Sequence, residues 1–398
     1  MRDVLAMVLA GGKPTKDQFS VLTMNRSKAS LPFGGLYRLI DFTLSSLMNS
    51  NIEKVGIITQ FLPSSLIDHI SDGFAWDMKG YERFVKILSP FVSYDNKDAW
   101  YKGTGDALRQ NLNFIYDHAP EYVFILSGEN VHNIDFKKIL DFFKSENGKS
   151  LLVYKNLSPE QYCHRFGYVE VEGNKIVKMY EKPDKPMTEY VSAGIYLFKK
   201  DFFLKSMEKY DKKNLPFDFV KDVIIHLIEE GEVLGYECKG EWEYVRDYYN
   251  YYRLHLDVID GKLPIRNWNV LTNLEDRNTG FRPSTQIKNK GVISDSLVAP
   301  GCIIEGEVFQ SVLFPGVKIG KNTKVHNSII MHDTIIGKSC LLNGVICDKD
   351  VIIEDGRKIG EEEVGKLLLK EDLVLIGKGA VIKNDIPKGK HIKPSFIL

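Results

Sequence analysis

A six-residue spacing of apolar residues dominates the last third of the chain. After about Pro283, apolar side chains recur at this interval, and turn-forming residues such as Gly316 and Gly320 stand between them. The recurring positions are Ile319, Val325, Met331 and, after a short slip, Ile335, Leu341, Cys347 and Ile353. This period fits neither a helix nor the alternation of an ordinary strand. It is typical of a β-helix, in which each short strand forms one side of a triangular coil, so we predict a β-helix over residues 284–398.

Two other segments frame this repeat. The charged stretch 355–372 interrupts the period, and we expect a helical insertion there before VLIGKGAVI at 374–382 resumes the repeat. Upstream, residues 251–283 form a linker with an expected helix at 251–260, followed by an irregular polar segment.

The first 250 residues alternate between strand-like and helix-like segments. Apolar runs predict strands at 4–10, 54–60, 122–128, 151–155 and 193–199, and helical spacing predicts helices at 38–50, 64–70 and 136–145. This alternation indicates an α/β domain with a mostly parallel sheet that helices cover on both faces. Ligands bind such sheets at the carboxyl ends of the strands. The loops Gly11–Gly12 and Gly128–Glu129 lie at such ends and are therefore candidate site loops.

Composition narrows the class of protein further. At 398 residues the chain is too long for one ordinary core, which favours two domains. Its 53 basic and 53 acidic residues cancel, so overall charge does not favour nucleic acid or a membrane surface as a partner. No apolar run approaches the roughly 18 residues of a membrane span. The five cysteines are scattered without a CxxC pair, which predicts free thiols in the cytoplasm rather than a zinc site or disulfides.

Four short stretches carry residues suited to phosphate and sugar chemistry. LAGGK at 9–13 offers backbone N–H groups at a strand end, and YKGTGDALRQN at 101–111 is a second glycine-rich turn. ILSGEN ends a strand with Glu129, whose carboxylate is a ligand type that Mg²⁺ prefers. YEKP places Glu181 and Lys182 before a proline turn, where they suit sugar hydroxyls and a phosphate. Taken singly, each stretch also fits an ordinary turn or helix start.

Together these stretches resemble the ADP-glucose pyrophosphorylases, the family of glucose-1-phosphate adenylyltransferases. The resemblance covers nearly the whole chain in order, through LAGG, LTMNRSKASLPFGGLYRLIDFTLSSLMNS, WYKGTGDALRQN, ILSGEN, RFGYVEV, YEKP, SAGIYLF and FDFVKDVI. The stretch from Arg26 to Ser50 is the most specific of these. The resemblance implies a Rossmann-like nucleotidyltransferase domain at 1–250, a linker at 251–283 and a left-handed hexapeptide β-helix at 284–398.

The resemblance also implies a reaction and its site residues. ATP and glucose 1-phosphate would give ADP-glucose and pyrophosphate for glycogen- or starch-type glucan synthesis, with Mg²⁺ as cofactor. The implied catalytic residues are Lys28, Glu129 and Asp247, of which Glu129 and Asp247 would bind the metal. The implied nucleotide-binding residues are Leu9, Gly11, Gly12, Gly103 and Thr104. The implied sugar-phosphate-binding residues are Tyr101, Gly167, Glu181, Lys182 and Ser192.

The resemblance further implies regulation and assembly. Arg26 and Arg38 stand where relatives bind regulatory phosphates, and the family suggests a homotetramer or a heterotetramer with a related subunit. Neither the effector nor the oligomeric state follows from these residues.

The chain departs from the family pattern in two loops. Pro14 stands in place of a glycine and removes an N–H donor, and Asp17 adds a negative charge nearby. Glu129 replaces an aspartate and Asn130 a histidine. The extra methylene of Glu129 displaces its carboxylate, and a misplacement of about 1 Å costs roughly 100-fold in rate.

These departures leave several hypotheses open. The chain is an active pyrophosphorylase with a variant loop, or a weakly catalytic or non-catalytic regulatory subunit of the same enzyme. A further alternative is a nucleotidyltransferase for another sugar phosphate. An acyltransferase on the β-helix, using His326 or His332, is the remaining alternative.

Overall fold

The computed structural model describes residues 1, 3–12, 19–91, 100–211, 216–363 and 365–395, so the loop positions Pro14 and Asp17 lie outside the described residues. The chain forms two compact units. The first contains Met1–Gly12, Phe42–Pro63 and Ile70–Tyr244, and the second contains Lys13–Asp41, Ser64–His69 and Val245–Leu398. The second unit therefore draws on early as well as late parts of the chain. The division at residues 250 and 283 stays a prediction.

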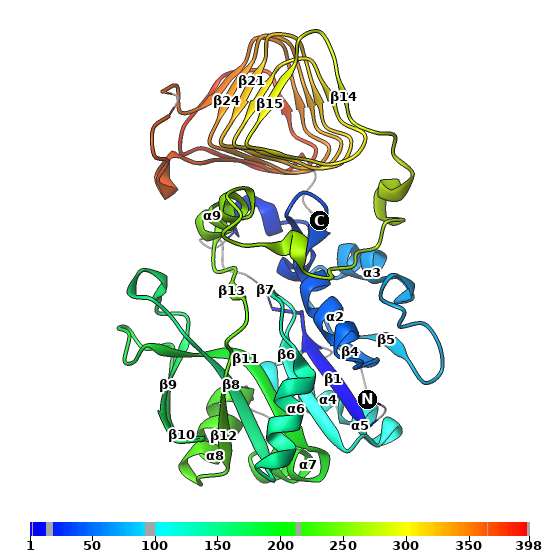
Figure 1. Ribbon diagram of the computed structural model, residues 1–398, viewed down its shortest axis with the longest axis vertical. Helices are drawn as coiled ribbons and strands as arrows, with labels where there is room; N and C mark the ends of the chain where they lie inside the picture. The colour runs from blue at the N-terminus through cyan, green and yellow to red at the C-terminus, as the bar shows by residue number, and fades with distance from the viewer. Residues whose placement is uncertain (2, 13–18, 92–99, 212–215, 364, 396–398) are drawn as a thin grey trace. The chain divides into compact units, whose positions relative to one another are not determined.

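The first unit is built on a nine-stranded sheet in the order β5-β4-β1-β6-β11-β8-β12-β10-β9 (Figure 1). The strands are β1 (Val4–Leu9), β4 (Lys54–Ile58), β5 (Phe84–Leu88), β6 (Tyr122–Ser127), β8 (Ser150–Asn156), β9 (Gly167–Glu172), β10 (Lys175–Glu181), β11 (Tyr190–Lys199) and β12 (Val233–Glu237). The first four strands in this order run parallel, as do β8 and β12, whereas β9, β10 and β11 pair in antiparallel fashion. The expected α/β sheet is thus confirmed, with an antiparallel part beyond β6.

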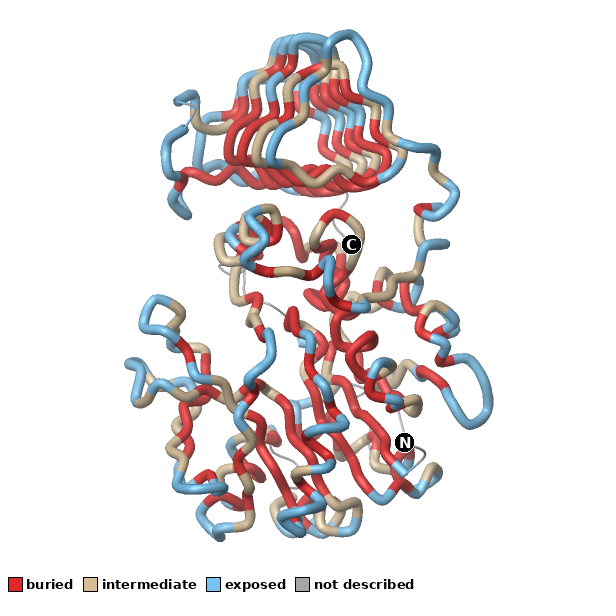
Figure 2. Tube along the Cα trace, viewed as in Figure 1, coloured by how far each residue is buried: buried red, intermediate tan, exposed pale blue. Residues whose placement is uncertain are grey.

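The helices of the first unit are α2 (Leu39–Asn49, from Phe42 onward), α4 (Thr104–Gln110), α5 (Leu112–His118), α6 (Phe136–Ser145), α7 (Lys200–Lys209) and α8 (Ile225–Glu229). Helix α3 (Ser64–Ile70) falls in the second unit as far as His69. The helices expected at 38–50, 64–70 and 136–145 are confirmed to within one residue at each end. In α6, the Asp135 carboxylate accepts hydrogen bonds from the backbone N–H groups of Lys137 and Lys138, which fixes the start of the helix. Along β1, the residues from Val4 to Val8 are all buried (Figure 2), as expected for a strand in the middle of a sheet.

Two strand ends set the position of the site. β1 and β6 are parallel neighbours, and Leu9 pairs with Ser127 at their carboxyl ends. The loops that follow, Gly11–Gly12 and Gly128–Glu129, therefore leave the sheet at the same edge, as the sequence predicted.

A short antiparallel ribbon extends this edge. β7 (Asn130–His132) pairs with β13 (Trp242–Tyr244), although more than a hundred residues separate them in the sequence. His132 is fully buried, and its ring nitrogens lie 3.2 Å from the Thr43 hydroxyl and 3.3 Å from the Ser46 hydroxyl of α2. Burial lowers the pKa of His132 to about 3, so this histidine stays neutral and holds the ribbon against α2.

The second unit contains the predicted β-helix. Three parallel sheets of six short strands each stack in register, as a left-handed hexapeptide β-helix requires (Figure 1). The first sheet holds β14 (Gln286–Ile287), β17 (Ile303–Ile304), β20 (Lys318–Ile319), β23 (Ile335–Ile336), β26 (Ile352–Ile353) and β29 (Val381–Ile382). The second holds β15 (Val292–Ser294), β18 (Glu307–Phe309), β21 (Lys324–His326), β24 (Leu341–Asn343), β27 (Lys358–Gly360) and β30 (Ile386–Pro387). The third holds β16 (Leu297–Val298), β19 (Val312–Leu313), β22 (Ile329–Ile330), β25 (Val345–Cys347), β28 (Val374–Ile376) and β31 (His391–Ile392).

The register of the repeat differs from the expected one at several positions. Ile335 is 41% exposed and Leu341 is only partly buried, whereas their neighbours Ile336 and Leu342 belong to the core of the coil. Along the chain, the core positions run through Ile319, Val325, Ile330, Ile336, Leu342, Cys347 and Ile353. Their spacings are 6, 5, 6, 6, 5 and 6 residues, because the step from the second sheet to the third is one residue shorter than the other two steps. The six-residue register of the sequence analysis is therefore wrong at Ile335 and Leu341, and also at Met331, which is buried but does not belong to the core of the coil.

The insertion at 355–372 contains no α-helix in the part that the structure describes. Its first residues form β27, a regular strand of the second sheet, and its end forms a 3-10 turn at Lys370–Asp372. Between them, Glu361 forms ion pairs with Lys366 at 2.9 Å and Lys388 at 2.8 Å. These pairs, rather than helical hydrogen bonds, hold the loop, and the repeat resumes with β28 and β29 as expected.

Early residues of the chain pack within the second unit. The hairpin strands β2 (Pro32–Phe33) and β3 (Tyr37–Arg38) pair with one another, and α9 (Tyr248–Ile259) lies against them. The Phe33 ring contacts the rings of Tyr251 and His255 at centroid distances of 6.1 and 4.4 Å. The helix expected at 251–260 is confirmed and begins three residues earlier. Among the described residues, no helix is both long enough and apolar enough to cross a membrane.

Candidate active site

The loop after β1 and the loop after β6 meet in the first unit. A Cβ atom on Gly11 would lie 2.7 Å from the backbone nitrogen of Gln60, so only a glycine lets the chain at position 11 pass this close to the segment that follows β4. A Cβ atom on Gly12 would lie 3.8 Å from Oε1 of Glu129. The structure therefore brings the predicted nucleotide residues Leu9, Gly11 and Gly12 together with the predicted metal ligand Glu129.

The GTGDA turn packs against the segment of the first unit that contains Phe217 and Phe219. Gly103 has a φ of 125°, and a Cβ atom there would overlap the carbonyl oxygen of Phe217. That oxygen accepts hydrogen bonds from the N–H groups of Gly105 and Asp106 at 2.9 and 3.1 Å. The Thr104 hydroxyl accepts from the N–H of Phe219 at 3.0 Å. The packing on Phe217 accounts for the glycine at 103, while the nucleotide contacts of Gly103 and Thr104 stay predictions.

Tyr101 is tied to the strand end beside the first loop. Its backbone N–H donates to Oε1 of Gln60 at 2.6 Å, and its hydroxyl accepts from Nδ2 of Asn111 at 3.0 Å. Burial raises the pKa of the Tyr101 hydroxyl, so the phenol stays protonated, and its O–H donates to the carbonyl oxygen of Leu88 at 3.4 Å.

A pocket of about 170 Å³ opens beside these loops. It brings together Gly167, Glu181 and Ser192, three of the predicted sugar-phosphate residues, which lie on three different strands. A Cβ atom on Gly167 would lie 3.0 Å from Oε2 of Glu181, so a larger residue would crowd this carboxylate. Ser127 and Asn130, on either side of the Gly128–Glu129 loop, line the same pocket. Ser127 and Asn130 thus connect the pocket to the Gly128–Glu129 loop.

Charge at the pocket comes from Glu181, Lys182 and Arg165. Nζ of Lys182 lies 2.9 Å from Oε1 of Glu181, and Arg165 lines the pocket. Burial lowers the pKa of Lys182, but the Glu181 carboxylate outweighs it and holds that pKa above its usual value. Lys182 therefore stays charged, as binding of a phosphate requires.

An aromatic wall completes the pocket and was missed by the sequence analysis. Phe166, Trp242 and Tyr244 line it, and the Phe166 ring lies 6.1 Å from the Trp242 ring and 5.5 Å from the Tyr244 ring between centroids. Such faces suit the C–H groups of a sugar ring. The signal for this wall was the WEY triplet shortly before Asp247, but only the pairing of β13 with β7 brings it to the pocket.

The remaining predicted catalytic residues belong to the second unit. Lys28 is buried in a 3-10 turn at Lys28–Ser30, with Nζ 5.4 Å from the centroid of the Phe19 ring. The Asp247 carboxylate caps α9 by accepting from the N–H of Asn250 at 2.8 Å, and it lies 3.3 Å from Nζ of Lys370. Within the described ranges, no group of three or more His, Cys, Asp or Glu residues is placed to hold a metal ion. The metal-binding roles of Glu129 and Asp247 stay predictions.

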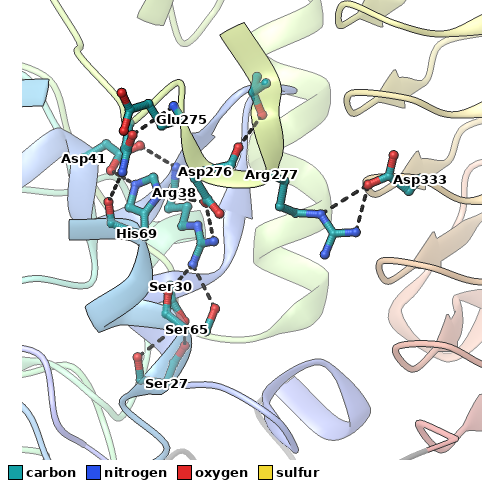
Figure 3. Close-up of polar contacts among 12 residues, drawn as sticks. Ser27, Ser30, Arg38, Asp41, Ser65, His69, Glu275, Asp276, Arg277 and Asp333 are labelled. Atoms are coloured by element: carbon teal, nitrogen blue, oxygen red, sulfur yellow. Dashed lines mark hydrogen bonds and ion pairs between the residues drawn. The ribbon is translucent and has the colours of Figure 1, made fainter. Parts of the chain in front are cut away.

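The two predicted effector arginines are paired with aspartates. Arg26 is buried and lies 2.6 Å from both carboxylate oxygens of Asp348. Arg38 pairs with Asp276 and donates to the carbonyl of Ser65 at 2.6 Å. Figure 3 shows the Arg38 contacts. Both arginines therefore anchor early residues of the chain inside the second unit.

His69 bridges two acids of this cluster (Figure 3). Its Nε2 lies 2.6 Å from Asp41 and its Nδ1 lies 2.9 Å from Asp276. Burial raises the pKa of Asp276, but the hydrogen bond from His69 and the charge of Arg38 outweigh it and hold that pKa well below its usual range. Asp276 is therefore ionised at neutral pH and joins the segments that carry Arg38 and His69.

Comparison with known proteins agrees with this architecture. The family model described as "Nucleotidyl transferase" matches residues 5–261, and "GlmU-like, C-terminal hexapeptide" matches residues 282–366. A glucose-1-phosphate adenylyltransferase of Bacillus cereus is 36% identical over 386 residues, which cover 94% of this chain and 98% of the relative. The protein of the same name from Fervidobacterium nodosum is 32% identical, over 98% of this chain and 95% of the relative.

The chain belongs to the glucose-1-phosphate adenylyltransferase family. It is a nucleotidyltransferase with a C-terminal hexapeptide β-helix, and its similarity to these adenylyltransferases extends over both units. The resemblance that the sequence analysis found in short motifs is thereby confirmed.

Proposed function

We propose that the protein joins ATP and glucose 1-phosphate into ADP-glucose and releases pyrophosphate. One observation carries the proposal: the predicted metal-binding acid stands in the loop whose flanking residues line the predicted sugar-phosphate pocket. Ser127 and Asn130 line the pocket, and Glu129, between them in sequence, lies beside Gly12 of the nucleotide loop. A nucleotide along that loop and a sugar phosphate in the pocket would meet at Glu129.

The chemistry requires alignment and charge neutralisation. A phosphate oxygen of glucose 1-phosphate attacks the α-phosphorus of ATP, the bond to the leaving pyrophosphate breaks, and no covalent intermediate is needed. Lys182 would face the sugar phosphate, and Glu181 and Ser192 the sugar hydroxyls. Lys28 would meet the phosphates of the nucleotide.

Glu129 has the donor chemistry that Mg²⁺ requires. Its carboxylate is a hard oxygen ligand at the edge of the predicted nucleotide loop, and Asp247 is the second proposed ligand. Bound Mg²⁺ would neutralise charge on the phosphates.

The decisive experiment is a pyrophosphate-release assay on the full chain with ATP, Mg²⁺ and glucose 1-phosphate, beside a reaction that lacks the sugar phosphate. Turnover of about 1 to 1,000 per second that depends on the sugar phosphate would support the proposal. Replacing glucose 1-phosphate with other hexose 1-phosphates tests the alternative of a different sugar. Turnover at the level of the control would contradict an active enzyme.

A regulatory subunit is the second candidate, and the position of Asp247 favours it. This carboxylate is engaged at the start of α9 and with Lys370, so it would have to leave both partners to reach a metal ion. Under this hypothesis the chain alone shows little turnover but changes the kinetics of a co-expressed catalytic relative.

Regulation and assembly complete the proposal. Arg26 and Arg38 are the proposed contacts for a phosphate effector, as the family resemblance implies, and to bind one they would have to exchange their pairs with Asp348 and Asp276. We further propose a homotetramer or a heterotetramer with a related subunit. The five cysteines are all free, which supports a location in the cytoplasm.

A further inference from the structure

Two residues that line the sugar-phosphate pocket each carry a buried polar atom without a hydrogen-bond partner among the described residues. These atoms are Oδ1 of Asn130 and Nε1 of Trp242, whose residues are 2% and 3% exposed. Buried polar atoms nearly always have a partner, because leaving them unpaired forfeits the hydrogen bond that water would make. Two such atoms on one pocket therefore point to a ligand that supplies the missing partners.

The orientation of the Asn130 amide is set by its surroundings. Nδ2 donates to the carbonyl oxygen of Ala193 at 3.4 Å, so a flipped amide would place two oxygen acceptors together. The backbone of Asn130 is held in β7 opposite Tyr244 of β13. Oδ1 thus belongs to a side chain that the fold holds in place beside the pocket.

The chemistry of the two atoms selects one end of a sugar phosphate. An amide oxygen accepts hydrogen bonds only, and an indole N–H donates only. A sugar hydroxyl does both, whereas an ionised phosphate oxygen accepts and would be repelled by Oδ1. The nearby Glu181 carboxylate is a further acceptor on the same pocket, and the aromatic wall favours the C–H faces of a sugar ring.

We propose that Asn130 is a specificity-determining residue of this enzyme: Oδ1 accepts a hydrogen bond from a ring hydroxyl of the sugar phosphate, and Nε1 of Trp242 donates to a hydroxyl oxygen in the same pocket. This inference rests on the proposed function. It assigns a role to a position at which the chain departs from the family pattern.

The test measures binding rather than turnover. Isothermal titration of the full chain with glucose 1-phosphate, in the presence of Mg²⁺ and a non-reactive ATP analogue, gives the affinity of the pocket. Asn130→Leu keeps the size of the side chain and removes the acceptor, and we expect it to weaken binding roughly 3- to 10-fold. The matched control is Gln110→Leu, because Oε1 of Gln110 is also buried without a partner in the described structure but lies outside the pocket. The control should bind like the unaltered protein.

Deoxy sugars identify the hydroxyl and separate recognition from damage to the fold. The probes are 2-, 3-, 4- and 6-deoxyglucose 1-phosphate. The unaltered protein should bind one of these probes about 10-fold more weakly than it binds glucose 1-phosphate. Asn130→Leu should bind that probe and glucose 1-phosphate with equal affinity. Asn130→Asp, which keeps an acceptor but cannot donate to Ala193, should retain the discrimination between this probe and glucose 1-phosphate.

The outcomes are distinct. If Asn130→Leu binds glucose 1-phosphate as tightly as the unaltered protein, or if every deoxy sugar loses the same factor with both proteins, the role of Asn130 is refuted and the proposed function stands. If the unaltered protein binds neither glucose 1-phosphate nor another hexose 1-phosphate, the proposed function itself fails, and the inference fails with it.

Discussion

The ion pair between Glu181 and Lys182 shows how a single side chain could set substrate affinity. The Lys182 side chain is 59% exposed, so it contributes little to the core, yet its charge stands at the rim of the pocket. We predict that Lys182→Ala raises the KM for glucose 1-phosphate about 10- to 100-fold, through loss of a charge-assisted hydrogen bond, with a smaller change in the KM for ATP. Initial rates at varied concentrations of each substrate measure both constants.

The control for this prediction lies on the same turn. Lys185 is exposed and, unlike Lys182, forms no ion pair with Glu181 in the described structure, so Lys185→Ala should leave both KM values unchanged. Equal effects of the two substitutions would mean that Lys182 acts only through the overall charge of the turn.

We expect the dependence of turnover on Mg²⁺ to come from Glu129. Glu129→Gln removes the negative charge but keeps the size of the side chain, and we predict a loss of turnover of about 100-fold or more, with the affinity for glucose 1-phosphate unchanged. Glu129→Asp should keep a metal-dependent rate. Pyrophosphate release measured across Mg²⁺ concentrations tests both variants, and Glu121→Gln, just before the start of β6, is the control.

Much of the site could be predicted from residues in short motifs, and the rest depended on distant pairing. Gly167, Glu181 and Ser192 fall in separate motifs, and the structure gathers them on one pocket. Trp242 and Tyr244 were missed because only the pairing of β13 with β7 brings them there, and pairing between remote strands leaves no local pattern. Asp247 follows them closely in sequence, but its carboxylate caps α9, a contact that the sequence analysis did not anticipate.

At the scale of elements, hydrophobic periodicity predicted the positions of the strands and helices. It did not predict which residue of each β-helix strand points into the core. Ile335 and Ile336 are the same residue type, so composition alone gives no reason to prefer either one for the core. The choice is made by the parallel pairing of Ile336 with Ile319 below and Ile353 above, which stacks the isoleucines in one column. A local slip of one residue moves a side chain to the other face of its strand.

The turn before α4 gives a test of backbone packing. A Cβ atom on Gly103 would overlap the Phe217 carbonyl, and the φ of 125° is costly for any other residue. We predict that Gly103→Ala lowers the free energy of unfolding by roughly 3 kcal/mol or more, since overpacking and backbone strain add. Urea denaturation followed by circular dichroism measures the change.

A second glycine separates the two effects. Gly231 also has a positive φ, of 72°, but a Cβ atom there would meet nothing within 4 Å. Gly231→Ala should therefore show backbone strain alone, about 1 kcal/mol. A loss at Gly103 no larger than the loss at Gly231 would show that the Phe217 loop moves away without penalty.

At the scale of the whole molecule, the second unit unites early and late parts of the chain through Arg26 and Asp348. Both side chains are almost fully buried, and removal of one partner leaves an uncompensated charge. We predict that Asp348→Asn costs about 3–5 kcal/mol of stability and increases proteolysis within residues 19–41. Asp350→Asn breaks a more exposed pair with Arg277 and should cost about 1 kcal/mol or less. Equal losses would contradict the importance of burial.

Lys349 makes the stability of this unit depend on pH. The residue is buried, and burial together with the charges of Arg38 and Arg26 holds the pKa of Lys349 well below the usual 10.5. The unfolded chain therefore binds a proton that the folded chain has lost, over the whole range between the lowered pKa and 10.5. Stability rises with pH wherever the unfolded state binds more protons, so this lysine destabilises the fold at neutral pH and less so as the pH approaches 10.5.

We therefore predict that Lys349→Met makes the protein more stable at pH 7 and flattens the rise in stability between pH 7 and pH 10. Each unit by which the two pKa values differ is worth about 1.4 kcal/mol, so the difference between variant and unaltered protein should shrink steadily with pH. Urea unfolding midpoints at several pH values measure this difference. Tyrosines and cysteines that titrate in the same pH range contribute equally to both proteins, so their contributions cancel in the difference. Lys321→Met, at an exposed lysine of the same unit, should leave the slope unchanged. A variant less stable than the unaltered protein at pH 7 would mean that Lys349 is charged and paired in the folded state.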